Sequence, residues 1–145
     1  MKLNITTGAI IDALAKAQSE FPILTQDKAG YNYTYLTLPN ILNELRPILG
    51  SNGLVLTQSN KIEVVDGMPF VEVTSLVMYK YEHIESTLSY PLGEAPKGMS
   101  EIQYLGSIIS YLRRYGVLSI LGIAGAEKEI EDIQTEIKTG DMKLK

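Results

Sequence analysis

The sequence predicts an α+β fold in which helices come first, antiparallel strands follow, and a long helix comes last. Three observations support this order. Apolar residues recur at helical spacing before residue 50, alternate between residues 54 and 90, and return to helical spacing after residue 100. Turn-forming residues, glycine and proline above all, cluster between these regions. The consecutive strands should therefore pair as hairpins within one sheet.

The first two helices are predicted from their apolar stripes and their caps. One covers residues 6–19, with Thr6 or Thr7 as its cap, and the other covers residues 38–49, with Thr37 as its cap. Their buried faces are expected to be Ile10, Ala13, Leu14 and Ala17 in the first helix, and Ile41, Leu42, Leu45 and Leu49 in the second.

The segment between these helices carries tyrosines at alternate positions. Tyr31, Tyr33 and Tyr35 follow Lys28 in a polar stretch that we expect to be a loop or a short strand. In an extended chain they would project to one side. They could stack on nucleic-acid bases, but half-buried packing is the commoner role for a single tyrosine.

Strands are expected from residue 54 onward. Residues 54–58 begin the run, and the Asp66-Gly67 pair between residues 61–65 and 68–79 indicates a tight hairpin. Residues 83–90 alternate and should form the next antiparallel strand.

The last helix is predicted from Ser100 or Glu101 to about Leu121, with Gly122 at its end. At about 100° per residue its polar and apolar side chains separate into distinct faces. The polar stripe holds Gln103, Ser107, Ser110 and Arg114; the core face holds Leu105, Ile108, Ile109 and Leu112; Tyr104, Tyr111 and Tyr115 line one flank, and Gly106 and Arg113 the other.

The polar stripe of this helix suits a nucleic-acid backbone. Amide, hydroxyl and guanidinium groups bind phosphate and sugar oxygens, whereas an ordinary solvated face would favour Glu and Lys. Arg113 and Arg114 add rigid cationic forks. Alternatively, the stripe packs against another element or subunit, and both interpretations can hold together.

Composition and charge limit the possible functions. A chain of 145 residues with 45% hydrophobic residues can bury one core, and the absence of cysteine favours a reducing cytoplasm. No signal or membrane-spanning segment is evident, so we expect a cytoplasmic protein with no membrane partner.

The net charge of −4 argues against a generic nucleic-acid binder, so the local placement of the cations must decide whether the protein binds nucleic acid. We expect one domain over residues 1–125 and a charged helix that frays into a tail over residues 126–145.

Groups for enzyme chemistry are scarce. His83 is the single histidine and has no cysteine or second histidine to complete a metal site. The acidic run from Glu127 to Asp132 lacks calcium-loop spacing, and no Gly-Lys-Ser/Thr phosphate loop is found. We therefore expect no enzymatic activity, no cofactor and no bound metal.

Several segments together form a more specific pattern. They are Tyr31-x-Tyr33-x-x-Leu36, Arg46-Pro47-x-Leu49, Gly53-Leu54, Gln103-x-x-Gly106-Ser107-x-x-Ser110-Tyr111-x-Arg113-Arg114-Tyr115 and Leu121-Gly122-Ile123. In order and spacing they resemble the essential recombination function (ERF) family of phage single-strand annealing proteins. The resemblance covers about residues 8–125, and the last-helix segment is its most specific part.

The resemblance implies the core of the Red beta-like annealing superfamily, in which a helix is followed by an antiparallel β-β-β sheet crossed by a long α-helix. It implies that single-stranded DNA binds between the sheet hairpin and that helix, and that complementary strands anneal without ATP. A homo-oligomeric ring or helical filament is implied, and a single-strand binding protein or an exonuclease of the host or phage is a further possible partner. Carried onto this chain, the DNA-binding candidates are Gln103, Ser107, Ser110, Arg113 and Arg114 on the helix, Lys61 and Lys80 on the strands, Lys97 before the helix, and Lys28, Tyr31 and Tyr33 near the N-terminus.

Two other functions stay open at this point. A protein that protects single strands would bind DNA without annealing it. A protein-protein adaptor would use the polar helix stripe as an interface, and the acidic balance favours it. Backbone contacts alone do not separate DNA from RNA.

Overall fold

The computed structural model describes residues 1–24, 28–30 and 33–124, and the predicted tail over residues 126–145 lies outside this part of the chain. The described elements are β1 (Lys2–Asn4), α1 (Ala9–Glu20), β2 (Lys28–Gly30), β3 (Tyr33–Tyr35), α2 (Leu38–Ser51), β4 (Val55–Val65), β5 (Met68–Tyr79), β6 (Glu82–Pro91) and α3 (Glu101–Leu121).

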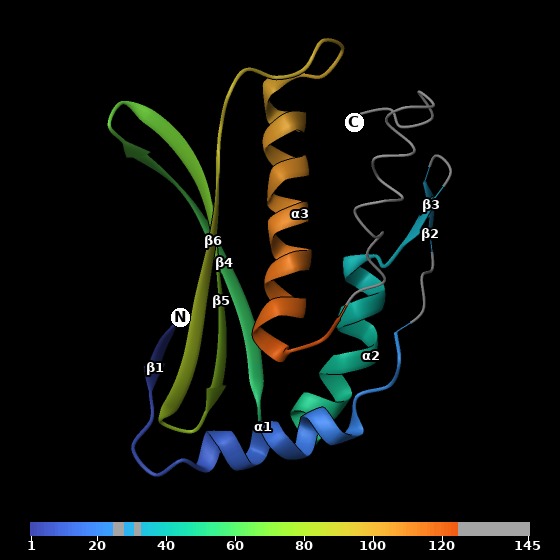
Figure 1. The fold of residues 1–145 in the computed structure, drawn as a ribbon, viewed down its shortest axis with the longest axis vertical. Coiled ribbons are helices and arrows are strands. Elements are labelled where there is room, and N and C mark those ends of the chain that lie inside the picture. The colour runs from blue at the N-terminus through green and yellow to red at the C-terminus, as the bar shows by residue number, and fades with distance from the viewer. Residues whose placement is uncertain (25–27, 31–32, 125–145) are drawn as a thin grey trace.

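One antiparallel sheet carries the fold, with strands in the order β1-β6-β5-β4. Figure 1 shows α3 running along one face of this sheet, with α1 across its lower end and α2 beside the lower part of α3. The strands β2 and β3 pair separately. The predicted α+β fold with a long helix across the sheet is therefore confirmed. The strand β1 was not predicted, and it pairs with the first half of β6, at residues 83–85.

The β4–β5 hairpin forms at the predicted turn. Val65 pairs with Met68, and Asp66 and Gly67 both have positive φ angles, 50° and 79°, as a tight two-residue hairpin turn requires. The two strand segments expected before this turn form the single strand β4. In Figure 1 the outer end of the hairpin diverges from α3.

The predicted helix faces are buried in α2 and for the most part in α1, where Ala13 is only partly buried; in the predicted core face of α3, Leu105, Ile109 and Leu112 are only partly buried. The side chain of Thr37 accepts a hydrogen bond from the backbone N–H of Asn40, at 3.3 Å, and caps α2. At the start of α3, Ser100 and Gln103 form a reciprocal capping box, and Gly122 ends the helix with a φ of 69°. The confirmed buried residues are Ile10, Leu14 and Ala17 in α1, Ile41, Leu42, Leu45 and Leu49 in α2, and Ile108 in α3.

The predicted cap of α1 is only partly right: Thr7 Oγ1 accepts from the Ala9 N–H at 3.3 Å, but Thr7 is not the N-cap residue. The helix begins after Gly8, which has a φ of 80° and no capping side chain, and the carboxylate of Glu82 on β6 takes the place of a local cap. Four backbone N–H groups donate to it: Thr6 (2.7 Å), Thr7 (2.8 Å), Gly8 (3.0 Å) and Ile10 (2.9 Å). Glu82 is 4% exposed, so this contact ties the start of α1 to the sheet inside the protein.

The hydrogen bonds lower the pKa of Glu82. The bond from the Ile10 N–H contributes most, and together with the other N–H groups it outweighs the effect of burial and brings the pKa from 4.5 to about 2. The charged form is therefore the one that the folded protein stabilises.

The helix α3 comes closest to the sheet at Gly116. A Cβ atom at this position would lie 2.7 Å from Ser75 Oγ and 3.3 Å from Gln58 Nε2. Ser75 is fully buried and accepts a hydrogen bond from Gln58 Nε2 at 2.9 Å, so neither group is able to move away easily. Glycine is needed here because α3 lies directly against β4 and β5.

Replacing Glu82 with Gln should remove a pH-dependent part of the stability. Because the folded pKa of about 2 lies below the ordinary value of 4.5, the carboxylate stabilises the fold above pH 4.5, and this contribution is lost as the pH falls toward 2. We expect Glu82→Gln to have a lower Tm than wild type at neutral pH and a shallower loss of Tm over that acidic range. Circular dichroism melts of both proteins measure this, with Glu85→Gln on the same strand as control. Equal slopes in wild type and Glu82→Gln would contradict the capping role.

Replacing Gly116 with Ala should destabilise the protein by about 1–3 kcal/mol, because the methyl group enters a space that is already filled. The matched control is Gly106→Ala in the same helix, where nothing lies within 4 Å of an added Cβ. The control should stabilise the protein by about 0.5–1 kcal/mol, because alanine favours helix. Urea unfolding measures both, and a stabilising Gly116→Ala would disprove the close contact.

Candidate nucleic-acid interface

The helix α3 is a cationic element in an acidic protein. After Glu101 in its first turn, the helix contains no Asp or Glu up to Leu121, and its charged residues are Arg113 and Arg114. The net charge of the whole chain is −4. The acidic excess therefore lies elsewhere, and an anion approaching α3 meets local positive charge.

The two faces of the sheet differ in charge. Side chains alternate along a strand, and the paired residues Gln58 and Ser75 face α3. When the alternation is followed along each strand from these two residues, the carboxylates of Glu63, Glu72 and Glu85 are found on the face away from α3. Among the described strands β4, β5 and β6, one carboxylate points to the α3 face, that of Glu82. Its oxygens accept hydrogen bonds from backbone N–H groups just before and within the first turn of α1. The acidic groups of these strands thus either face away from α3 or, in the case of Glu82, remain charged and accept hydrogen bonds from backbone N–H groups.

Lys61 lies on the outer face of the sheet, away from α3. Its Nζ atom is 2.7 Å from a carboxylate oxygen of Glu63 and 3.3 Å from one of Glu72. The hydrogen bond to Glu63, followed by that to Glu72, raises the pKa of Lys61, and the same ammonium group lowers the pKa of Glu63. The structure does not bring this predicted DNA-binding residue together with the arginines.

Arg113 lies on the flank of α3 that faces β4. Its Nε atom donates to Gln58 Oε1 at 3.4 Å, and its carbonyl oxygen accepts from Gln58 Nε2 at 3.0 Å. Within the described part of the chain, no carboxylate lies within ion-pair distance of its guanidinium. Gln58 therefore positions an arginine whose charge is not neutralised by those residues.

Arg114 lies on a different side of the helix. Its Nη1 atom donates to the carbonyl oxygen of Leu36 at 3.3 Å. Its guanidinium carbon is 4.9 Å from the ring centroid of Tyr111 and 5.1 Å from that of Tyr115. The two adjacent arginines, predicted as one site, therefore contact different neighbours.

The other members of the predicted polar stripe have mixed roles. Gln103 Oε1 accepts from the backbone N–H of Ser100 at 3.0 Å, so its side chain serves the capping box. Ser107 Oγ donates to the carbonyl oxygen of Tyr104 at 2.7 Å, within the helix. Ser110 is exposed to solvent. Part of the stripe thus stabilises α3 itself.

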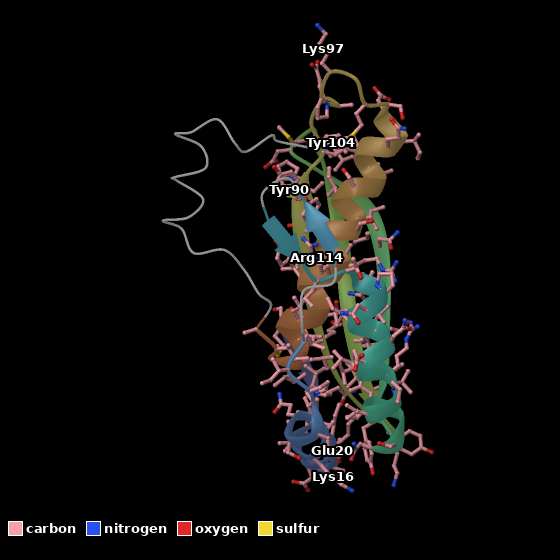
Figure 2. The ribbon with its side chains drawn as sticks, turned by 90° about the vertical axis from the view of Figure 1, so that its right-hand side faces the viewer. Lys16, Glu20, Tyr90, Lys97, Tyr104 and Arg114 are labelled. Carbon is pink, nitrogen blue, oxygen red and sulfur yellow. The ribbon has the colours of Figure 1, made fainter. Side chains whose placement is uncertain are left out.

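The remaining predicted residues lie apart from one another. Lys80 is in the β5–β6 turn, with its Nζ atom 5.4 Å from the ring of Tyr79. Lys97 is exposed in the loop before α3, at the upper end of Figure 2, whereas Arg114 lies about midway along the molecule. Lys28 and Tyr33 belong to β2 and β3, and Tyr31 is outside the described residues.

Sequence reasoning missed Gln58 and the division of charge between the sheet faces. The positions of Glu63, Glu72 and Glu85 become equivalent only when the strand register is known. That register follows from the Asp66-Gly67 turn, so counting outward from this turn would have placed Glu63 and Glu72 on one face. No sequence signal identifies Gln58.

No catalytic centre is evident among the described residues. They contain no group of three or more His, Cys, Asp or Glu side chains that could hold a metal ion. A hollow of about 400 Å³ under the β6–α3 loop is lined mainly by apolar side chains and has a single charged residue, Glu101. None of the described helices has the length and apolarity needed to span a membrane.

Comparison with known proteins gives one family. The family model described as the ERF superfamily matches residues 10–140. Neither the curated proteins nor the solved structures give a match. The family match covers α1 from Ile10 onward, the other described helices, and every described strand except β1.

Proposed function

The chain belongs to the ERF superfamily, and from this membership we propose that it binds single-stranded DNA along α3 and anneals complementary strands without ATP. The family acts in phage recombination by single-strand annealing, and its members are generally non-catalytic. The observation that carries the proposal is the charge of α3, which presents Arg113 and Arg114 and no carboxylate after Glu101. We accordingly propose that the protein is not an enzyme.

The charge distribution favours the α3 side over the outer face of the sheet. A phosphate at the outer face would approach Glu63, Glu72 and Glu85, and the strand lysines there, Lys2 and Lys61, are already ion-paired. At α3 a phosphate would meet guanidinium groups, which bind phosphate oxygens through two parallel hydrogen bonds. Binding would therefore depend on a local cationic surface despite the net charge of −4.

Annealing requires two polyanions to come together. Arginines along a bound strand reduce the repulsion between strands, and a strand held extended presents its bases for pairing. The protein then accelerates pairing by alignment, and no bond is made or broken in the protein.

Each subunit offers few phosphate contacts, so we propose that several subunits act along one strand as a homo-oligomer, in a ring or a helical filament. The hairpin end of the sheet supports this proposal because apolar side chains are exposed there: Ile62 (51%), Val64 (67%), Val65 (49%) and Met68 (49%). Ile62 and Val64 lie on the α3 face of the hairpin, and Val65 and Met68 lie on the outer face. Exposed apolar side chains are typical of interfaces, and an identical subunit is the occupant we propose. A single-strand binding protein or an exonuclease as partner stays a prediction.

The protein should accelerate the pairing of two labelled complementary oligonucleotides in the absence of ATP. If Arg113 and Arg114 each bind one phosphate, the logarithm of the binding constant per subunit should fall with the logarithm of salt concentration with a slope of about −1.4. Stopped-flow pairing kinetics and strand titrations at several salt concentrations measure both. Slower pairing with protein than without would indicate a strand-protecting protein, and no binding of either strand would favour an adaptor.

Replacing both Arg113 and Arg114 with Ala should weaken strand binding by more than about tenfold, because two phosphate contacts are lost. The double variant Lys2→Ala/Lys16→Ala removes the same charge from β1 and α1 and should keep most of the binding. Circular dichroism checks the fold of both variants, and size-exclusion chromatography checks their assembly. Annealing at the wild-type rate by a folded arginine variant would disprove the assignment.

A further inference from the structure

Aromatic side chains line the flank of α3 that lies opposite Arg113. Tyr104, Tyr111 and Tyr115 share this flank because they are seven and four residues apart. Since Arg113 contacts β4 through Gln58, this flank lies on the β6 side, where Tyr90 is on the sheet face toward α3. In Figure 2, Tyr104 and Tyr90 lie between Lys97 and Arg114 along the long axis.

We propose that Tyr111 and Tyr115 form a stacking site for the unpaired bases of a single-stranded nucleic acid, with Arg114 beside them to contact the phosphates. This inference rests on the proposed function and assigns a base-contacting role to tyrosines that packing does not bury.

The two rings are exposed and held in a fixed arrangement. Tyr111 is 45% exposed and Tyr115 is 40% exposed. Their ring centroids are 6.3 Å apart and their planes differ by 17°. The guanidinium of Arg114 lies near both rings and is itself hydrogen-bonded to the Leu36 carbonyl. Because the Arg114 guanidinium lies over both rings, it restrains their orientation, and less side-chain entropy should be lost on binding.

The charge of the flank suits a nucleic acid. No carboxylate occurs on α3 after Glu101, and the residues of β6 that face the helix beyond Ile84 are Ser86, Leu88 and Tyr90. A phosphate is therefore attracted by Arg114 and meets no acidic side chain from these elements.

The spacing of the rings suits an extended strand. Stacked bases in duplex DNA are about 3.4 Å apart, whereas the tyrosine rings are 6.3 Å apart. Two successive bases that stack on these rings must separate from each other. A base held by its face keeps its hydrogen-bonding edge accessible, and stacking on a ring accepts any base. Both properties are what pairing of arbitrary complementary sequences requires.

The test compares an oligonucleotide of thymidines with an abasic strand of the same length, which keeps the phosphates and lacks the bases. Wild type should bind the thymidine strand about tenfold more tightly. Tyr111→Leu/Tyr115→Leu should lose this preference while still binding the abasic strand as wild type does. Tyr111→Phe/Tyr115→Phe keeps the rings and should keep the preference. Tyr81→Leu removes a tyrosine that is 94% exposed in the β5–β6 turn and should behave as wild type.

Tyrosine fluorescence gives a second readout, because the chain has nine tyrosines and no tryptophan. The thymidine strand should quench this fluorescence in wild type, and the abasic strand should not. Because Tyr111→Phe/Tyr115→Phe keeps both rings but removes these two tyrosine fluorophores, its quenching should be smaller than that of wild type, and equal quenching would overturn the assignment even if the leucine variant fails to fold.

The outcomes separate this inference from the proposed function. Binding of both strands with equal affinity and equal quenching would overturn base stacking and leave the annealing proposal intact. A folded leucine variant that keeps the preference, or loses both strands equally, would also overturn it. Failure of wild type to bind either strand would reject the proposed function, and the stacking site with it.

Discussion

The contact of Gly116 with Ser75 and Gln58 determines how α3 lies on the sheet. With no side chain at Gly116, the helix approaches β4 and β5 until backbone and small polar groups touch, and Gln58 bridges to the Arg113 carbonyl. This single point of close approach sets the rotation of the helix about its axis. From that rotation it follows that Arg113 lies toward β4 and that the tyrosine flank lies toward β6.

A second buried polar contact joins the N-terminal helix to the same sheet. Glu82 is the carboxylate that β6 directs toward the helical side, and its charge is balanced by backbone N–H groups at the start of α1. The buried carboxylate thus has hydrogen-bond donors for its oxygens although no lysine or arginine forms an ion pair with it in the described part of the chain. For the proposed function this matters, because Arg113 and Arg114 are not used to neutralise Glu82.

The separation of charge between the two sides of the molecule reconciles an acidic chain with a nucleic-acid role. Glu63, Glu72 and Glu85 share the outer face of the sheet with Lys61, and α3 carries the arginines on the opposite side. A net charge averages over both sides, so it says little about either. For the same reason Lys61, which is ion-paired with carboxylates on the outer face, is a poorer partner for a phosphate than the arginines of α3.

The sequence by itself determined the elements that depend on residues close to one another along the chain. Caps, turns and apolar periodicity are local, which is why Thr37, the Asp66-Gly67 turn and the span from Ser100 to Gly122 were predicted correctly. Tertiary structure alone decided the contacts between distant residues. The cap of α1 comes from a residue 72 positions away, and Arg113 depends on Gln58, 55 positions away. Periodicity gave the order of side chains around α3, but only packing on the sheet decided which side faces which partner, because rotation of a helix about its axis is fixed by contacts outside it.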